Sequence, residues 1–129
     1  MSYRLVMKDS EYAIGFSFGQ LDAYIYMINK GVKSIGVPAI LLECDSPVWS
    51  IIDHEIARSG LMNLVLDWRK AENTYPMVRR MIFPPHLSSQ ANYASELLFK
   101  RYKSIDDHKD LGELFGYGER NIEEFLSRY

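Results

Sequence analysis

The stretch IGFSFGQLDAYIYMI, at residues 14–28, has a counterpart in LGELFGYGERNIEEF, at residues 111–125. At one fixed offset, both stretches contain an apolar residue, a glycine, the pair Phe-Gly, an acidic residue and two apolar residues three positions apart. An acidic cap candidate precedes each stretch and a glycine ends its first apolar run; these residues are Asp9, Asp106, Gly19 and Gly116. Side-chain oxygens cap helix starts and glycine ends helices, so the pattern predicts a helical hairpin at each end of the chain. Duplication, or two ordinary hairpins that look alike, would both explain the likeness.

Two further features of the pattern fit a helical corner. Gly15 and Gly112 lie one turn before the predicted corner. Because a glycine inside a helix costs about 1 kcal/mol relative to alanine, we expect these glycines where two helices pack closely. Asp22 and Glu119 would lie in the first turn of the second helix, where the helix dipole stabilises a negative charge.

The spacing of the pattern also resembles the helix-turn-helix of DNA-binding proteins, which implies that the second helix of a copy contacts DNA. Such a helix needs donors for base edges and phosphates. The outward positions of the second copy would be Gly118, Glu119, Arg120, Glu123 and Glu124. Those of the first copy would be Leu21, Asp22, Ala23, Tyr26 and Met27. The acidic second copy would repel phosphates and the first offers no base, so a DNA-binding regulator is disfavoured and nucleic acid is not an expected partner.

The segment GYGERNIEEF, residues 116–125, resembles the Gly-Tyr-Pro-x-Cys-Cys-[Ile/Val]-x-x-Phe segment of a family of small, mainly archaeal proteins of unknown function. The glycine, the tyrosine, the branched residue and the phenylalanine match. Gly118 stands in place of the proline, and Arg120 and Asn121 stand in place of the two cysteines. This chain therefore does not share any metal or redox role of those cysteines, and the resemblance implies no other activity.

The composition is that of a globular protein. The 129 residues suit a single domain, and 47% of them are hydrophobic, which is enough to bury a core. The formal net charge of −2 argues against a general binder of nucleic acid or of anionic membranes. No apolar run has the length of a bilayer span, so no membrane association is expected. The single cysteine, Cys44, permits no internal disulfide, and a cytoplasmic location is the simplest expectation.

Between the two hairpins, the sequence predicts a strand-helix-strand-strand core. The expected strands are residues 37–43, 61–68 and 77–83, and the expected helices here and beyond are residues 48–59 and 88–102. Pro38 must lie at the beginning of the first strand or on an edge of the sheet, and Gly31 is the expected end of the first hairpin. We therefore expect a single α+β or α/β domain with a small mixed sheet of about three strands. Its parts would be a helical hairpin at residues 9–31, the core at residues 37–83 and a helical part at residues 88–129.

The pair Arg79-Arg80 falls in the last expected strand, where consecutive side chains point to opposite faces. One guanidinium must therefore meet an apolar environment, and a buried guanidinium needs a carboxylate. Asp67, on the neighbouring strand, is the expected partner. A functional alternative is that Arg79 or Arg80, with Arg69 and His86, binds a phosphate or a carboxylate at the sheet edge.

Glu43, Cys44 and Asp45 follow the first expected strand directly. The carboxyl ends of strands in α/β folds often collect ligands, which makes Glu43 and Asp45 candidate ligand-binding residues. Cys44 would be a nucleophile if His86 or His54 came within hydrogen-bond reach. The expected role of Cys44 is instead that of a small buried thiol.

Asp53, His54 and Glu55 are consecutive on an expected helix. Side chains of consecutive helical residues point about 100° apart, so these three cannot close on one metal ion. The sequence also contains no glycine-rich phosphate loop, nucleophilic serine motif or cysteine pair. It therefore predicts no metal and no cofactor.

Three functions remain, in order of preference. The first is a non-catalytic interaction module that forms a homodimer, because Tyr24, Tyr26 and Met27 give one helix apolar character around much of its circumference. The second is an enzyme or a binder of an anionic or phosphorylated small molecule. Its site would gather Glu43, Asp45, Asp67, Arg79, Arg80 and His86. The third is the helix-turn-helix regulator.

Overall fold

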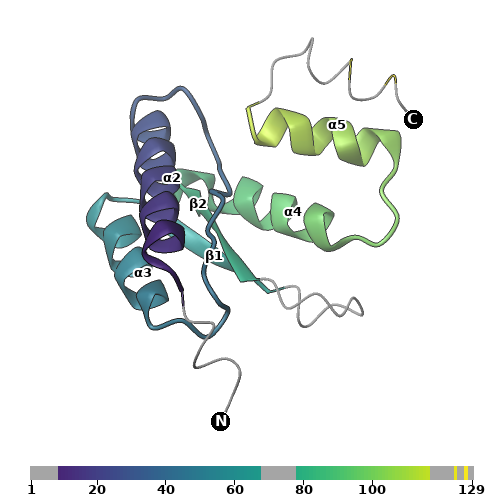
Figure 1. Cartoon of the computed structure of the whole chain (residues 1–129). Helices are drawn as coiled ribbons and strands as arrows, with labels where there is room; N and C mark the ends of the chain where they lie inside the picture. Colours follow the sequence, from purple (N-terminus) through teal and green to yellow (C-terminus); the bar gives the residue numbers. More distant parts are fainter. Residues whose placement is uncertain (1–8, 68–77, 117–123, 125–126, 128–129) are drawn as a thin grey trace.

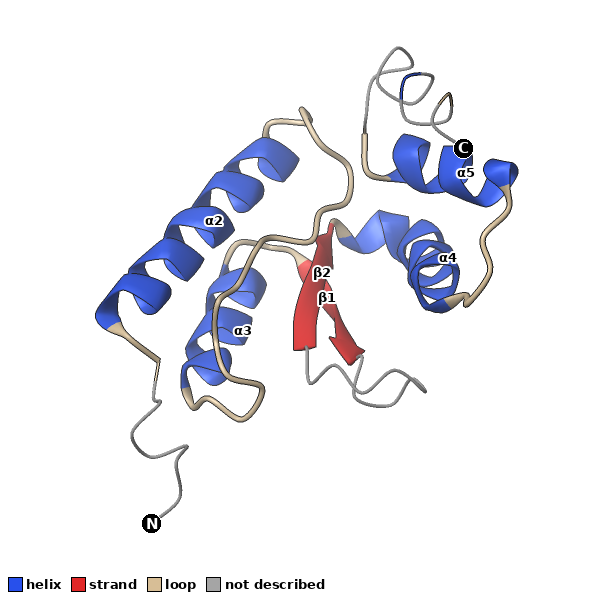
Figure 2. Cartoon of the chain, turned by 45° about the vertical axis from the view of Figure 1, so that its right-hand side comes forward, coloured by secondary structure: helices blue, strands red, loops and turns tan. Residues whose placement is uncertain are grey.

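The computed structural model describes residues 9–67, 78–116, 124 and 127 (Figure 1). In chain order the elements are α2 (Glu11–Asn29), α3 (Val48–Arg58), β1 (Met62–Asp67), β2 (Val78–Phe83), the 3-10 helix η2 (Pro85–Leu87), α4 (Ser88–Phe99) and α5 (Ile105–Leu114). The two strands form an antiparallel ribbon, with α2 and α3 on one side and α4 and α5 on the other (Figure 2). This architecture confirms an α+β fold, although the described residues contain two strands instead of about three.

Helix α2 contradicts the predicted N-terminal hairpin. Residues 11–29 form one continuous helix, and Gly19 lies in its middle with ordinary helical backbone. The cost of one interior glycine, about 1 kcal/mol, is too small to break a helix whose apolar face continues past it. Ser10, not Asp9, caps the start by accepting a hydrogen bond from the Ala13 amide at 3.0 Å. The helix ends before Gly31, whose φ of 74° confirms the predicted stop.

At the C-terminal copy the predicted stop is confirmed. Helix α5 ends at Leu114, and Gly116 has a φ of 78°, a conformation that glycine adopts without a Cβ penalty. The start differs from the prediction, because Ser104 is the N-cap and Asp106 lies in the first turn. Apart from Glu124, the second helix predicted for this hairpin lies outside the described residues.

Residues 37–43 do not form the predicted strand. Only Gly36 pairs with the sheet, through two hydrogen bonds with Ile82 of 3.0 and 2.8 Å. The hydrogen bonding to β2 does not continue beyond Gly36. Pro38, which is buried, has no amide hydrogen to donate to the next bond of the ladder. Two later amides of this segment bind α2 and its N-terminal flank instead. Leu41 donates to Ser17 Oγ and Glu43 donates to Asp9 Oδ1, both at 2.8 Å.

Replacing Ser17 with alanine is expected to lower the free energy of unfolding by about 1–2 kcal/mol. Ser17 is fully buried; its hydroxyl donates to the Ala13 carbonyl at 2.7 Å while accepting from Leu41. The substitution leaves the Leu41 amide without its acceptor. Urea denaturation measures the loss. Ser50→Ala is the control, because that hydroxyl also bonds a carbonyl but is exposed, and equal losses for both variants would contradict the prediction.

The β1–β2 ribbon separates two apolar clusters. The register runs from Met62 opposite Phe83 to Asp67 opposite Val78, so the strands expected at residues 61–68 and 77–83 both form and pair antiparallel. Successive β2 residues point to opposite faces. On the α2/α3 face, the buried cluster is Leu21, Ile28, Ile40, Trp49, Ile52, Ile56, Leu61 and Ile82. On the α4/α5 face, it is Ile35, Leu66, Met81, Phe83, Ala91, Ala94, Leu97 and Leu111.

Helix α3 follows the prediction closely. Pro47 immediately precedes it, and Trp49, Ile52 and Ile56 are buried at helical spacing. Gly60 has a φ of 80° just beyond its end. The proline, the periodic apolar residues and the glycine therefore mark start, buried face and stop, as local sequence signals do in regular helices.

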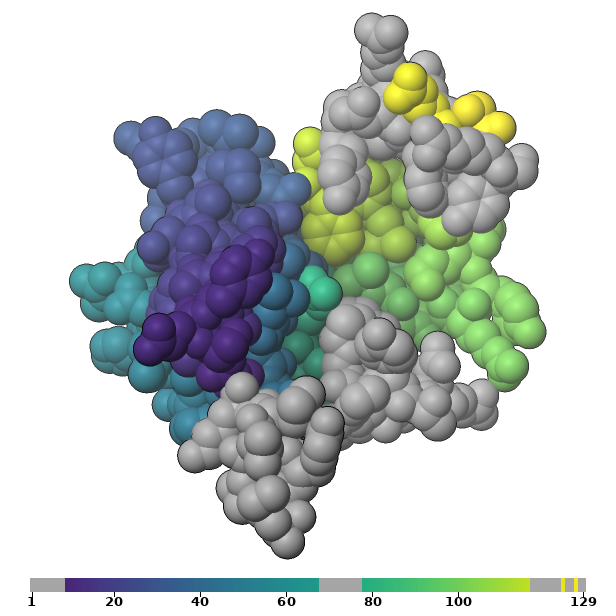
Figure 3. All heavy atoms as spheres, viewed as in Figure 1, coloured from purple at the N-terminus to yellow at the C-terminus, as the bar shows by residue number. Residues whose placement is uncertain are grey.

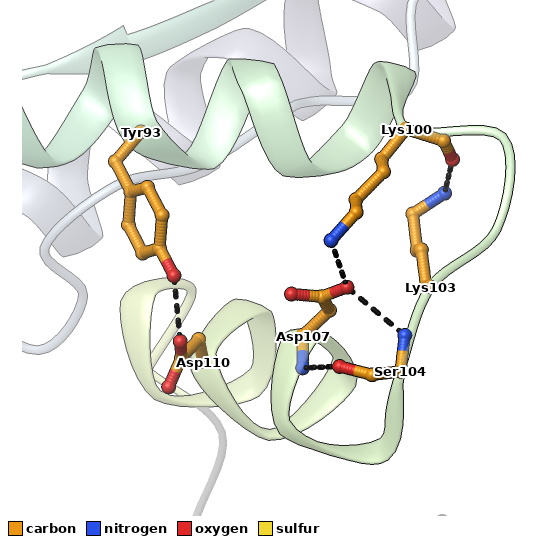
Figure 4. Close-up of polar contacts among 6 residues, drawn as sticks. All are labelled: Tyr93, Lys100, Lys103, Ser104, Asp107 and Asp110. Atoms are coloured by element: carbon orange, nitrogen blue, oxygen red, sulfur yellow. Dashed lines mark hydrogen bonds and ion pairs between the residues drawn. The ribbon is translucent and has the colours of Figure 1, made fainter.

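Helices α4 and α5 are joined by polar contacts at the turn between them and along their facing sides (Figure 4). Helix α4 ends at Phe99, three residues earlier than predicted. Ser104 and Asp107 form a capping box, in which each side chain accepts a hydrogen bond from the other's backbone amide. Lys100 Nζ lies 2.7 Å from Asp107 Oδ2, and the Tyr93 hydroxyl donates to Asp110 at 2.7 Å. The capping box fixes the start of α5, and the two side-chain contacts tie α5 to α4.

The Lys100 ammonium, followed by the Ser104 amide, lowers the pKa of Asp107 below its ordinary value. Because this folded-state pKa lies below the unfolded value of about 3.9, the ionised carboxylate stabilises the fold at neutral pH. That contribution is lost as pH falls through the folded-state pKa. We therefore expect Asp107→Asn to destabilise the protein at pH 7 and to cost less stability at about pH 3, below the unfolded-state pKa. Urea denaturation at both pH values measures the difference in free energy of unfolding between the parent and the variant. Asp106→Asn, at an exposed position, is the control. A difference that does not change with pH would contradict the prediction.

Candidate functional site

The ribbon places the predicted ligand-binding residues at separate locations. Asp67 and Arg79 lie near the end of the ribbon where β1 stops, and His86 follows β2 at the opposite end. A strand of this length spans about 17–20 Å. His86 is exposed, as are Glu43 and Asp45 in the turn before α3. The structure therefore does not bring the six candidates into one cleft.

Arg80 is the one buried candidate, and its carboxylate partner comes from a helix. Its side chain is 9% exposed, and its Nε and Nη2 atoms donate to the two oxygens of Asp53 at 2.8 and 3.2 Å. The guanidinium carbon lies 4.2 Å from the centre of the Trp49 ring. The predicted pairing with Asp67 is thus corrected to Asp53 on α3. A planar, bidentate pair stacked on an indole is a strong structural contact between α3 and β2.

The guanidinium of Arg80 is closed to ligands. Nη1 is buried and lacks a hydrogen-bond partner among the described residues. An anion could reach this nitrogen only if the packing opened, and Asp53 already supplies the negative charge. The prediction of a buried arginine that needs a carboxylate is confirmed, and the site is an ion pair that joins two elements.

Sequence reasoning missed Asp53 and Trp49 as partners of Arg80. A signal was present, because Asp53 follows Trp49 by four residues and so shares the inward face of the helix. An acid beside a buried aromatic predicts a basic partner from another element. The identity of that partner, 27 residues away, depends on how α3 packs on the ribbon.

The observed contacts of the segment before α3 hold this segment against the rest of the fold. The Glu43 carbonyl accepts a hydrogen bond from Trp49 Nε1 at 2.9 Å, which secures the turn to the indole beside Arg80. Cys44 is a free, half-buried thiol. Within the described ranges, no group of three or more His, Cys, Asp or Glu residues is arranged to hold a metal ion.

A second candidate surface lies on α2, which occupies the edge of the molecule (Figures 2 and 3). We define its outer face as Tyr12, Gly15, Gly19, Ala23 and Tyr26, all of which are exposed. Tyr12 and Tyr26 are 75% and 64% exposed. The only charged residues of this 19-residue helix are Glu11 and Asp22. Both acids are exposed and border the outer face. A surface helix normally carries more charges on its solvent side, so this helix is poor in charge.

The glycines of the outer face have no packing role among the described residues. A Cβ atom added at Gly15 or at Gly19 would meet nothing within 4 Å. Neither residue has a positive φ, so the backbone does not require glycine. The expected close packing of helices at Gly15 is therefore absent inside the described part of the molecule. Each glycine destabilises the helix by about 1 kcal/mol relative to alanine, and no contact among the described residues compensates for this cost.

None of the described helices is both long and apolar enough to cross a bilayer. Comparison with protein-family models found no match, and comparisons with curated proteins and with solved structures found none either.

Proposed function

We propose that the protein is a non-catalytic interaction module that self-associates through the outer face of α2. The observation that supports this proposal is the exposure of two tyrosines beside two glycines that no contact in the described part of the chain explains. Tyrosine contributes a large contact area at interfaces, and charged residues are depleted at interface centres. Small residues between the tyrosines allow another helix to approach closely.

The size of this surface sets the expected affinity. A helix of 19 residues is about 28 Å long, which provides a small interface compared with those of permanent dimers. We therefore expect a reversible homodimer with a dissociation constant in the micromolar range. The closed ion pair of Arg80 and Asp53 offers no comparable support for binding of an anionic ligand.

Sedimentation equilibrium tests the proposal over a range of about 1–100 µM protein. The expected result is a mass that rises from monomer to dimer with concentration. Tyr12→Glu and Tyr26→Glu each place a charge in the outer face and should shift the protein to monomer. Tyr102→Glu is the matched control, because Tyr102 is equally exposed but lies in the turn after α4. A strictly monomeric parent protein over the whole range would refute self-association.

A further inference from the structure

We infer that the two copies pack α2 against α2 in antiparallel orientation about a two-fold axis that passes beside Gly19, an inference that rests on the proposed function. The outer face is symmetric about that residue. Gly15 and Ala23 each lie four positions from Gly19, and Tyr12 and Tyr26 each lie seven positions from it. Since four and seven residues are close to one and two helical turns, all five residues fall on one side of the helix.

Antiparallel pairing makes this face complementary to itself. A two-fold axis beside Gly19 places Gly15 of one copy at the level of Ala23 of the other, and Tyr12 at the level of Tyr26. Small residues then meet small residues at the centre, and aromatic residues meet aromatic residues at both ends. A two-fold interface requires such self-complementarity, whereas an unrelated partner protein does not.

Charge distinguishes the antiparallel arrangement from a parallel one. The acid Glu11 lies at the N-terminal end of α2, and the exposed Lys30 follows its C-terminal end, where its ammonium lies 5.8 Å from the Tyr26 ring centre. In an antiparallel pair, Lys30 of one copy comes within about one turn of Glu11 of the other. In a parallel pair, Glu11, Asp22 and Lys30 would each lie level with the same residue of the other copy, so like charges would share a level and no acid would lie level with a base. The helix dipoles would also be aligned side by side.

Cysteine cross-linking tests the orientation in a full-length Cys44→Ser background. Helices in close contact lie about 8 Å apart, which leaves facing Cα atoms within the 7 Å that a disulfide bridges. Gly15→Cys and Ala23→Cys are made as separate proteins, one of them tagged, and each is oxidised alone and in a mixture. The expected result is cross-linking in the mixture and at least tenfold less in either protein alone. The space around Gly15 means that the new side chain does not disturb the monomer.

The possible outcomes separate this inference from the proposed function. A dimer by sedimentation in which Ala23→Cys cross-links to itself would mean either parallel helices or an axis beside Ala23, and either result would overturn the inference while self-association stands. A dimer in which no combination cross-links would place the interface elsewhere and would overturn the inference. A monomer at all concentrations would refute both.

A bulky residue at the axis gives an independent readout. Gly19→Leu is expected to raise the dimer dissociation constant at least tenfold, because the side chains of the two copies would collide at the axis. The same variant should melt at or above the temperature of the parent monomer, since the position is open in the monomer and leucine favours helix. An unchanged dissociation constant would overturn the inference.

Discussion

Replacing Asp53 with alanine is expected to lower the free energy of unfolding by about 2–4 kcal/mol. The substitution removes both acceptors of the Arg80 guanidinium and leaves a cation in a place where its side chain is 9% exposed. The cost falls below that of a fully enclosed pair because Asp53 is itself 40% exposed, so water replaces part of the interaction. Urea denaturation at neutral pH, followed by circular dichroism, measures the difference.

Two variants show whether the loss comes from the buried charge. Glu55→Ala removes a carboxylate from the same helix, but its partner Arg58 is exposed, so little change is expected. Asp53→Leu combined with Arg80→Met removes both charges and should restore much of the lost stability, as apolar replacements of buried pairs do. If Asp53→Ala unfolds at the same urea concentration as the parent, the pair does not stabilise α3 on the ribbon.

Replacing Gly36 with valine is expected to lower the free energy of unfolding by about 3 kcal/mol. Even a Cβ atom at this position would lie 2.4 Å from Cδ1 and 2.7 Å from Cε1 of Tyr24, well inside normal contact distances. Gly36 is also buried and hydrogen-bonded to Ile82, so its backbone cannot move away without breaking the bridge. Thermal and urea denaturation both measure the effect.

A double-mutant cycle identifies the Tyr24 ring as the cause. In a Tyr24→Ala background the clash is absent, so Gly36→Val should cost at least about 1 kcal/mol less than in the parent. An equal cost in both backgrounds would mean that the valine acts through the backbone pairing of Gly36 instead.

Local signals in the sequence were sufficient where one element carried its own start, face and stop. Helix α3 has Pro47, three buried apolar residues and Gly60, and the antiparallel strands follow from two apolar runs before Pro84. The same signals failed at Gly19, because glycine marks a helix end only when the apolar face also stops there. Residues 37–43 have the apolar composition of a buried strand, but a partly buried apolar loop has the same composition, so composition does not separate the two.

The candidate surfaces depended on tertiary structure in different ways. The sequence predicted that one of two arginines is buried with a carboxylate, but the choice of Asp53 requires the packing of α3 on β2. The apolar character of the first helix is predicted from Tyr24, Tyr26 and Met27. Only a continuous α2 shows that Tyr26 faces outward while Tyr24 is half-buried against Gly36.

The ribbon between the two helical layers has a consequence for how the molecule unfolds. Met81 and Ile82 are neighbours in β2, yet each belongs to a different apolar cluster. Detachment of that single strand would expose the interiors of both halves to water together. Heating should therefore produce one sharp heat-absorption peak whose calorimetric and van't Hoff enthalpies agree.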